Sequence, residues 1–355
     1  MKTLDWYLGR SIIQTTGFAL MVLVGLNTLI KFIDQLRSVG RGTYDLAAAG
    51  LYTLYSMPGD LVLFFPMAAL IGGLTGLGAL ASNSELVVMQ SAGMSRLQII
   101  ISVMKTALFL ALCMMALGEW GVPEAQKKAK ELRASAISGG SVFNAKKGIW
   151  AKDSDVFINI ENVDSSGRLN GLNMYNFDKE TLELKQVTQA KTAIPHAQGW
   201  MLSDVNRINL GEDKVTSEKL AQSLYHSDLT PEKLGVVSVK PEALAFTGLV
   251  SYLNYLKQND QDTSNYELAF WRKIMQPVSI AVMLLVALSF IFGPLRTVTM
   301  GARIIMGVVT GIVFNLTDKI FGPIVLVYEI PPVIGAIVPS LLFIAFATYL
   351  LNKRS

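Results

Sequence analysis

Six long apolar runs constrain this chain more than any other feature of its sequence. Each run has about twenty residues, the length that a helix needs to cross the hydrocarbon core of a bilayer. The runs cover residues 12–33, 61–81, 97–117, 270–292, 304–324 and 333–351. Of all 355 residues, 51% are hydrophobic and only 16% are charged, which is outside the usual range of soluble domains. The sequence therefore predicts an α-helical membrane protein with six transmembrane helices.

The basic residues near the ends of the runs predict an orientation. An even number of spans places both termini on one side of the membrane, and the short segments on that side are basic. Their basic residues are Lys2, Arg10, Arg96, Arg296, Arg303, Lys353 and Arg354. Because short basic segments remain in the cytoplasm, both termini are predicted to be cytoplasmic. The first run lacks a small-residue cleavage site, so we interpret it as an uncleaved span.

A short polar segment, residues 82–95 (SNSELVVMQSAGMS), joins the second and third runs on the predicted cytoplasmic side. Ser82 followed by Glu85 matches a capping box, and Gly93 is suited to the left-handed position that ends a helix. These signals predict a surface helix that could dock into another protein, although a simple tight turn is the alternative. The predicted docking knob consists of Leu86, Val87, Met89 and Gln90.

The stretch between the third and fourth runs has the character of a separate domain. It begins with a basic helical pattern at residues 124–137 and ends with a second helical pattern at 241–258. Short runs typical of strands lie between them, at residues 148–152, 156–163, 169–177, 182–193, 200–210 and 215–225. This spacing favours a small antiparallel sandwich or open roll, and its place between spans three and four makes it extracytoplasmic.

The predicted organisation therefore has three parts. Residues 1–118 form spans one to three with the surface helix 82–95, residues 119–266 form the extracytoplasmic domain with its flanking helices, and residues 267–355 form spans four to six.

A few charged residues lie within or close to the predicted spans. Lys31 follows about twenty apolar residues, and charge at this depth usually faces a partner or a hydrated cavity. One interpretation is that Lys31 snorkels and pairs with Asp34, or balances Asp318 across a helix interface. The other is a basic rim for an anionic ligand, which Lys130 and Arg133 on the following helical pattern would extend.

Large apolar residues and small residues also stand out in the spans. Phe64, Phe65 and Pro66 are expected to interrupt the second span, where the two phenylalanines would either line an acyl-chain cavity or face lipid. The spacing of two glycine pairs predicts close helix packing. These pairs are Gly72 with Gly76 and Gly307 with Gly311.

Several chemistries lack their residues. The chain has no phosphate-binding loop, no His-Glu-x-x-His and no Gly-x-Ser-x-Gly, so we expect no catalytic residue. The two histidines are far apart and the single cysteine, Cys113, lies in an apolar run, so we expect no metal or cofactor. A net charge of +4 is too small to indicate nucleic-acid binding.

Five segments spread along the chain are similar to those of a known family. They are LIKFIDQLRSVGRGTYD (29–45), FFPMAALIGGLTGLGALASNSELVVMQSAGMS (64–95), GEWGVPEAQ (118–126), LTPEKLGVV (229–237) and ALSFIFGPLRTVTMGAR (287–303). On these segments the chain resembles the LptF/LptG permeases of the lipopolysaccharide-export ABC transporter. The resemblance implies a half-transporter of the bacterial inner membrane with a periplasmic β-jellyroll.

The resemblance also implies partners and an energy source. The chain would pair with LptF and bind a dimer of the LptB ATPase, which holds ATP and Mg. It would extract lipopolysaccharide from the periplasmic leaflet and pass it to LptC and through it to LptA. Burial of each methylene stabilises the membrane-bound lipid by about 0.8 kcal/mol, so extraction requires coupled ATP hydrolysis.

Roles for individual residues follow from the same resemblance. Residues 82–95 would be the coupling helix, with Glu85 at the ATPase contact and with Leu86, Met89 and Gly93 in the same helix. The substrate-binding positions would be Lys31 and Arg37 of the first span, Lys130 and Arg133 of the third-span extension, and the apolar Phe64 and Phe65. A basic position of the family next to Arg37 is Ser38 here.

Two other functions remain as alternatives. A membrane-anchored scaffold would recruit periplasmic partners without binding lipid, and it predicts that Lys31 can be replaced freely. An intramembrane lipid-modifying enzyme would need a nucleophile or paired carboxylates at membrane depth, and the sequence shows none.

Overall fold

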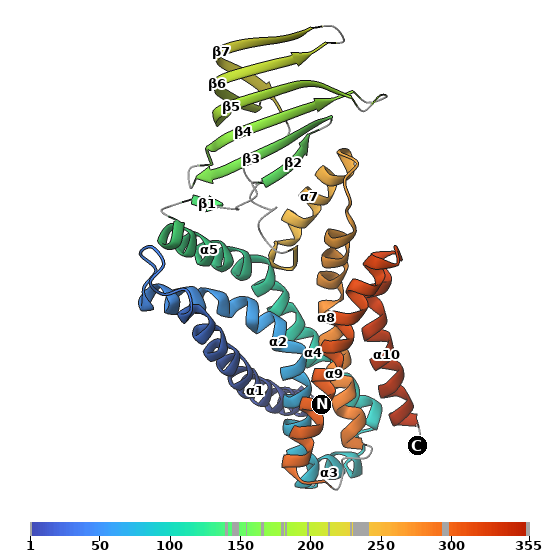
Figure 1. Cartoon of the computed structure of the whole chain (residues 1–355). Helices are drawn as coiled ribbons and strands as arrows, with labels where there is room; N and C mark the ends of the chain where they lie inside the picture. The colour runs from blue at the N-terminus through green and yellow to red at the C-terminus, as the bar shows by residue number, and fades with distance from the viewer. Residues whose placement is uncertain are drawn as a thin grey trace. The chain divides into compact units, whose positions relative to one another are not determined.

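Long helices and an antiparallel β-sheet divide the chain into two units. The computed structural model describes residues 2–138, 141–143, 149–153, 155–164, 167–178, 181, 183–196, 199–211, 214–227, 229, 241–292 and 298–352. The helical unit comprises Met1–Ile33, Ser56–Ala125 and Ser264–Ser355. The β unit comprises Asp34–Tyr55 and Gln126–Thr263, and so includes a part of the chain outside the predicted domain 119–266. Figure 1 traces both units from the N-terminus to the C-terminus.

In the described part of the chain, six helices are long and apolar enough to cross a membrane, which confirms the six predicted spans. They are α1 (Lys2–Leu36), α2 (Leu46–Ser82), α4 (Arg96–Ala116), α8 (Ser264–Phe292), α9 (Met300–Val327) and α10 (Pro332–Asn352). Helix α4 continues through a π-helical turn, η1 (Leu117–Gly121), into α5 (Val122–Ser138). Most of these helices extend beyond the apolar runs, because polar residues at their ends remain helical.

Helix α2 is continuous, so the expected interruption at Phe64–Pro66 is wrong. Both Pro58 and Pro66 lie inside this helix. A proline removes only one backbone donor, and neighbouring helices stabilise the turn around it in a membrane protein. Helix α2 therefore continues through both prolines as one helix of 37 residues.

Both predicted glycine pairs lie at helix contacts within this chain. A Cβ at Gly72 would overlap the backbone of Thr16 in α1, and one at Gly76 would meet Thr15. The Thr15 hydroxyl also donates to the Gly72 carbonyl at 2.7 Å. On α9, Gly307 lies against Leu74 and Gly311 lies against Met67, both in α2. The small residues thus bring α1 and α9 close to α2, as small-residue pairs do in membrane proteins.

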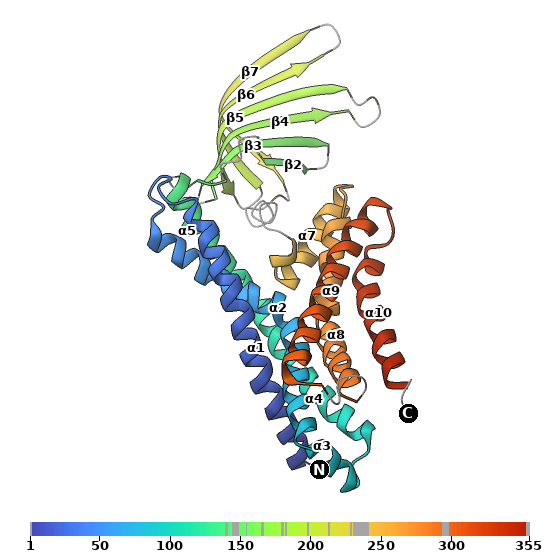
Figure 2. The same ribbon diagram turned by 60° about the horizontal axis from the view of Figure 1, so that its bottom comes forward.

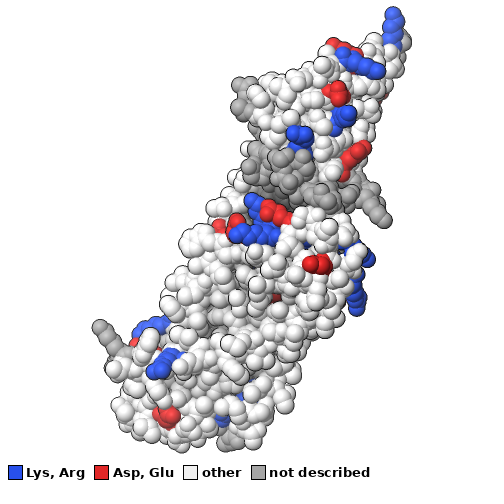
Figure 3. All heavy atoms as spheres, turned by 90° about the vertical axis from the view of Figure 1, so that its left-hand side faces the viewer, with Lys and Arg blue, Asp and Glu red and all other residues white. Residues whose placement is uncertain are grey.

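The core of the helical unit lies between α2, α4 and α8. Its fully buried side chains include Leu74, Leu77, Val103, Met283 and Leu284. Helices α1 and α9 contribute least to this core. In the most apolar 18-residue stretch of each, only 17% is buried, against 61% for α2. The face in Figure 3 shows charged side chains mainly toward the ends of the long helices, with a nearly uncharged surface between them.

The ends of the helical unit agree with an even number of spans. Figure 2 shows the N-terminus and the C-terminal end of α10 at the same end of this unit as the short helix α3 (Glu85–Ser91). Of the basic residues used to predict the orientation, Arg296, Lys353 and Arg354 lie outside the described residues. Arg303 is only 2% exposed and donates to the carbonyl oxygen of Gly78, so it joins α9 to α2 and adds no charge to the surface.

The described residues of the β unit form a seven-stranded antiparallel sheet. Its strands are β1 (Ser141–Phe143), β2 (Ile149–Asp153), β3 (Val156–Asp164), β4 (Leu169–Phe177), β5 (Leu184–His196), β6 (Gly199–Leu210) and β7 (Val215–His226). The order is β1-β3-β4-β5-β6-β7, and β2 also pairs with β3. Neighbouring long strands are thus neighbours in sequence, and the six predicted strands are confirmed with small shifts at their ends. Strand β1 is too short to give a period-two pattern and was not predicted.

The described strands form a meander, and the jellyroll closure implied by the resemblance stays a prediction. Helix α7 (Phe246–Gln258) follows a short 3-10 turn (Pro241–Ala243), as the periodicity of residues 241–258 predicts. It contacts the sheet through Tyr255, whose hydroxyl donates to the carbonyl oxygen of Lys152 at 2.6 Å. This contact joins α7 to β2 within the β unit.

Candidate functional site

Lys31, the predicted cation of the first span, forms an ion pair with Asp60 of α2. Its amino group lies 2.6 Å from Oδ1 and 2.8 Å from Oδ2 of that carboxylate. The Asp60 side chain is 5% exposed and the Lys31 side chain 36% exposed. The packing of α1 against α2 brings these two side chains together. The partner of Lys31 is therefore Asp60, and neither Asp34 nor Asp318 as predicted. Asp34 is exposed on α1.

Asp318 instead pairs with Arg272 across α8 and α9. The guanidinium Nη2 lies 3.4 Å from Asp318 Oδ2 and also donates to the carbonyl oxygen of the same residue. On the adjacent position of α8, Lys273 lies 3.2 Å from Glu119 in the π-helical turn η1. A buried or half-buried charge requires a partner of opposite sign, and these pairs supply it between helices.

In the β unit, Arg133 of α5 reaches the segment that joins α1 to α2. Its Nη2 lies 3.5 Å from the hydroxyl of Ser38, and its guanidinium lies 5.5 Å from the ring centroid of Tyr52. A cation thus contacts the position where the resemblance implies a basic residue. The neighbouring Arg37 is exposed, and Lys130 is half-buried on α5.

The same segment is held to α5 by its backbone. The amide of Thr43 donates to the Ala136 carbonyl at 2.8 Å, and a Cβ at Gly42 would overlap that carbonyl oxygen. Gly42 has a φ of 59°, in the left-handed region that favours glycine. Tyr44 is buried beside it, and burial raises the pKa of its hydroxyl above the ordinary value.

The two phenylalanines proposed for an acyl-chain cavity differ in environment. Phe65 is 4% exposed and belongs to the core of the helical unit. Phe64 is half-buried on another side of α2. Of the two, only Phe64 has surface that a lipid chain can reach in this conformation.

The surface helix α3 is present, but it begins differently from the prediction. The capping box at Ser82 is wrong: the Ser82 hydroxyl donates back to Ala79 inside α2, and Ser84 precedes α3 in a left-handed conformation without a side-chain cap. Helix α2 runs on to Ser82, so only two residues remain for the turn. The capping box of this region lies at Ser95 and Gln98, where both reciprocal hydrogen bonds start α4.

The C-terminal end of α3 is as predicted. Gly93 has a φ of 94°, and its amide donates to the Gln90 carbonyl at 3.0 Å. The Met94 amide donates to the Met89 carbonyl at 3.0 Å, which completes a Schellman motif. This motif turns the chain directly from α3 into the capped start of α4.

The side chains of α3 divide into an inner and an outer face. Leu86 and Met89 are buried in the core of the helical unit, whereas Val87 and Val88 are exposed. Glu85 is half-buried, and its Oε2 accepts a hydrogen bond of 2.8 Å from the hydroxyl of Tyr7 in α1. Of the four predicted knob residues, Leu86 and Met89 therefore anchor the helix, Gln90 is half-buried and Val87 is exposed. Glu85 and Val88 complete the outer surface with Val87.

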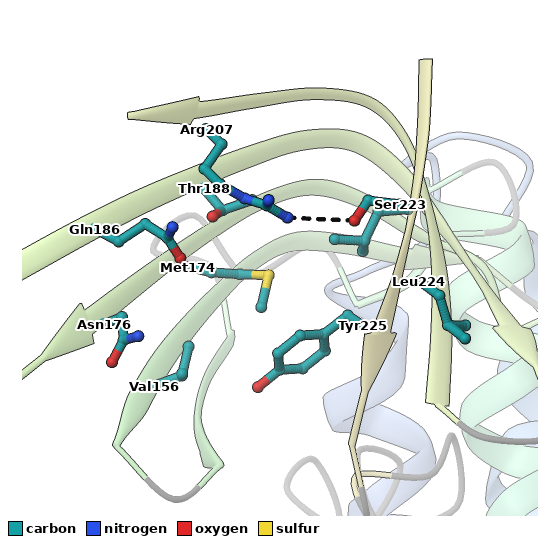
Figure 4. A pocket seen from close by; sticks show the side chains of 10 residues that line it. Val156, Met174, Asn176, Gln186, Thr188, Arg207, Ser223, Leu224 and Tyr225 are labelled. Atoms are coloured by element: carbon teal, nitrogen blue, oxygen red, sulfur yellow. Dashed lines mark hydrogen bonds between the residues drawn. The ribbon is translucent and has the colours of Figure 1, made fainter. Parts of the chain in front are cut away.

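A small pocket lies on the sheet of the β unit (Figure 4). It has a volume of about 110 Å³, and Arg207 enters it from β6 to donate to Ser223 at 3.3 Å. Tyr225 lies on the pocket wall and donates to Asp153 at 3.0 Å, and burial raises the pKa of its hydroxyl. Since small-molecule pockets usually exceed about 300 Å³, we assign this one no ligand.

Sequence reasoning missed Asp60, Tyr7 and Arg272 as partners of the predicted residues. Asp60 precedes the second apolar run by one residue, and a carboxylate at such an edge was a signal that a nearby span supplies a cation. Tyr7 and Arg272 carry no comparable signal, because tyrosine and arginine are common at both membrane interfaces.

Known proteins are similar to this chain over its whole length. A family model described as "Lipopolysaccharide export system permease LptF/LptG" matches residues 6–353. The lipopolysaccharide export system permease protein LptG of Escherichia coli (strain K12) is 48% identical over 355 residues, 99% of this chain and 98% of that protein. The protein of the same name from Haemophilus influenzae is 46% identical over 356 residues, 100% of this chain and 99% of that protein. With six membrane-spanning helices, an inserted antiparallel sheet and this match, the chain belongs to the LptF/LptG family of lipopolysaccharide export permeases.

Proposed function

We propose that this chain is a permease subunit that extracts lipopolysaccharide from the periplasmic leaflet of the inner membrane and passes it to a periplasmic bridge. The observation that carries the proposal is identity of 46–48% to LptG proteins over nearly the full length of both chains. Hydrolysis of ATP in a partner ATPase supplies the free energy, and that partner binds the ATP and Mg. The chain itself acts as a transporter subunit without a catalytic role.

In this proposal the chain spans the inner membrane with both termini and α3 in the cytoplasm. Support comes from the common end of the helical unit at which α3 and the two ends of the chain lie. The β unit then lies in the periplasm, where it forms a jellyroll and meets LptC and, through it, LptA. The sheet supports this part of the proposal because it supplies long antiparallel strands for such a closure.

The partner LptF contacts the faces of α1 and α9 that the chain leaves open. Exposed apolar side chains follow α1 at Phe18, Met21 and Leu26, and α9 at Val309 and Ile312. These two helices flank α2, to which the glycine contacts join them. A second permease or membrane lipid covers such apolar surfaces in the bilayer.

The LptB dimer binds the outer surface of α3. The contact consists of Glu85, Val87 and Val88, because Leu86 and Met89 face the core. The Schellman turn at Gly93 transmits a push on α3 directly to α4. Helix α3 is thus the coupling helix of the complex.

In the helical unit, Lys31 binds an anionic group of lipopolysaccharide and Phe64 packs against its acyl chains, with Phe65 in the core behind it. In the β unit, the basic residues Arg37, Lys130 and Arg133 bind anionic groups of the lipid. A polar headgroup needs cations and hydrogen-bond donors, which these side chains provide. The half-exposed Lys31 supports this assignment, since its side chain is 36% exposed although its partner is buried.

The test places a photocrosslinking residue at Ile30, which is exposed beside Lys31. The complex with both partners is assembled in membranes with lipopolysaccharide, and the adduct is measured before and after ATP is added. We expect an adduct that declines with ATP. An intact, ATP-hydrolysing complex without any adduct would contradict the proposal and favour the scaffold that only recruits periplasmic partners.

A further inference from the structure

We propose that Asp60 is a positioning residue that holds Lys31 as a weak, reversible site for the phosphate of an anionic lipid headgroup. This inference rests on the proposed function, because it concerns how the cation of the first span releases its lipid.

The geometry fixes the amino group of Lys31 on one side. Both carboxylate oxygens of Asp60 accept from it, at 2.6 and 2.8 Å, across the contact between α1 and α2. An ammonium has three donors, so two are used and one remains. The amino group is therefore held in one place rather than sampling the rotamers of a free lysine.

The burial of Asp60 prevents Lys31 from leaving. With only 5% of its side chain exposed, the carboxylate would become an uncompensated buried charge if the ammonium moved to a ligand. A ligand must therefore approach Lys31 where it stands. Exposure of the lysine side chain at 36% leaves room for that approach.

The surroundings indicate the ligand class. Leu29, Ile30 and Ile33 are exposed on α1 around Lys31, so an anion that reaches it also meets apolar surface. A phosphate attached to hydrocarbon chains satisfies both surfaces, whereas free phosphate satisfies only one. The site thus fits a lipid headgroup better than an inorganic anion.

The carboxylate also lowers the affinity of the site. The pair of Lys31 and Asp60 has no net charge, so a bound phosphate lies near one cation and one anion. A unit charge about 4 Å away, even in water, changes an interaction by about 1 kcal/mol, or about fivefold in binding. Asp60 therefore keeps the headgroup loosely held, which allows release during transport.

The experiment compares wild type with Asp60→Asn, with the photocrosslinking residue at Ile30 and the complete complex in lipid nanodiscs. Asparagine keeps an acceptor for Lys31 but removes the charge. We expect the lipopolysaccharide concentration that gives half-maximal adduct to fall about fivefold. We also expect the adduct to be lost more slowly after ATP is added. A merely structural role predicts a weaker adduct or none, so an equal or weaker adduct in an assembled Asp60→Asn complex overturns the inference.

A matched control replaces an aspartate that forms another lysine–aspartate ion pair between two helices. Asp5 of α1 lies 3.0 Å from Lys105 of α4, and along the helix it is about 39 Å from Lys31. We expect Asp5→Asn to leave the adduct at position 30 unchanged. A gain equal to that of Asp60→Asn would overturn the assignment to Lys31.

If the Asp60→Asn complex does not assemble, a second variant tests the same inference. The exchange Lys31→Asp with Asp60→Lys keeps an ion pair but moves the cation to the buried position. We expect loss of the adduct in an assembled complex, while a retained adduct overturns the inference. Phosphatidylglycerol is expected to compete for the adduct, and equal competition by inorganic phosphate overturns the lipid assignment.

The outcomes separate this inference from the proposed function. Absence of any adduct in wild type contradicts lipid binding at the first span and therefore the proposed function. An adduct in wild type that Asp60→Asn leaves unchanged contradicts only the role of Asp60.

Discussion

The hydroxyl of Tyr7 donates to Oε2 of Glu85 at 2.8 Å, so the first turns of α1 are joined to the surface helix α3. Glu85 is the residue that we propose for the ATPase contact. The hydrogen bond uses its Oε2, so Oε1 can contact the ATPase. Movement of α3 is thereby linked to α1 as well as to α4.

We expect Tyr7→Phe to weaken the link between ATP hydrolysis and export. The substitution removes the hydroxyl that joins α1 to Glu85 of α3. Lipopolysaccharide released per ATP hydrolysed should fall several-fold in reconstituted complexes, with assembly intact. Glu85→Ala removes the acceptor of the same hydrogen bond, so adding Tyr7→Phe to it should cause no further loss of coupling.

The control for this variant is Tyr328→Phe, which removes an exposed hydroxyl just after the end of α9. We expect its coupling to equal that of wild type. A further loss when Tyr7→Phe is added to Glu85→Ala would show that the two residues act separately.

The two faces of α3 make a second prediction. Leu86→Ala should lower the free energy of unfolding by about 2–5 kcal/mol, because Leu86 is buried in the core. Val88→Ala should leave stability nearly unchanged and weaken ATPase binding, because Val88 is exposed. Thermal unfolding and co-purification of the ATPase measure the two effects. The opposite pattern, with Val88→Ala unstable and Leu86→Ala defective only in binding, would reverse the assignment of the faces.

Gly42 makes a third prediction within the β unit. Gly42→Ala forces a Cβ onto the Ala136 carbonyl and requires a left-handed alanine, so we expect proteolysis of the loop between α1 and α2 to accelerate. Gly40→Ala is the matched control, since Gly40 also has a positive φ, 89°, but its Cβ would meet no atom within 4 Å. Left-handed strain alone amounts to about 1 kcal/mol, so Gly40→Ala should have the smaller effect. Equal effects would mean that the contact with α5 contributes nothing.

Most elements of this fold could be predicted because their signals are local. The apolar runs specify six spans by length alone, and alternation located β3, β4 and β6 within about two residues of their observed ends. The serine motifs show the limit of local signals. Ser82 with Glu85 and Ser95 with Gln98 both match a capping box, but only the second forms one, because α2 extends past the first.

The pairing of charges could not be predicted from the sequence. Lys31 and Asp60 are 29 positions apart, and their contact depends on how α1 packs against α2 at Gly72. Spacing along one helix favoured Asp34, which lies on the same helix three residues away. Contacts between helices require the tertiary structure, so the partners of the predicted site residues could not be found from the sequence.

High pH should loosen the contact between α7 and β2. Burial, with a smaller contribution from Asp153, raises the pKa of Tyr255 from its ordinary value of 10 to about 12. A raised tyrosine pKa means that the folded state holds the proton more tightly, so its stabilisation is complete below pH 10 and is lost as pH rises through 12. We expect the thermal midpoint of the β-sheet circular dichroism signal to fall over that window. Tyr255→Phe should start from a lower midpoint, because it lacks the hydrogen bond to Lys152, and should fall less steeply; an identical slope would show that another group controls the transition.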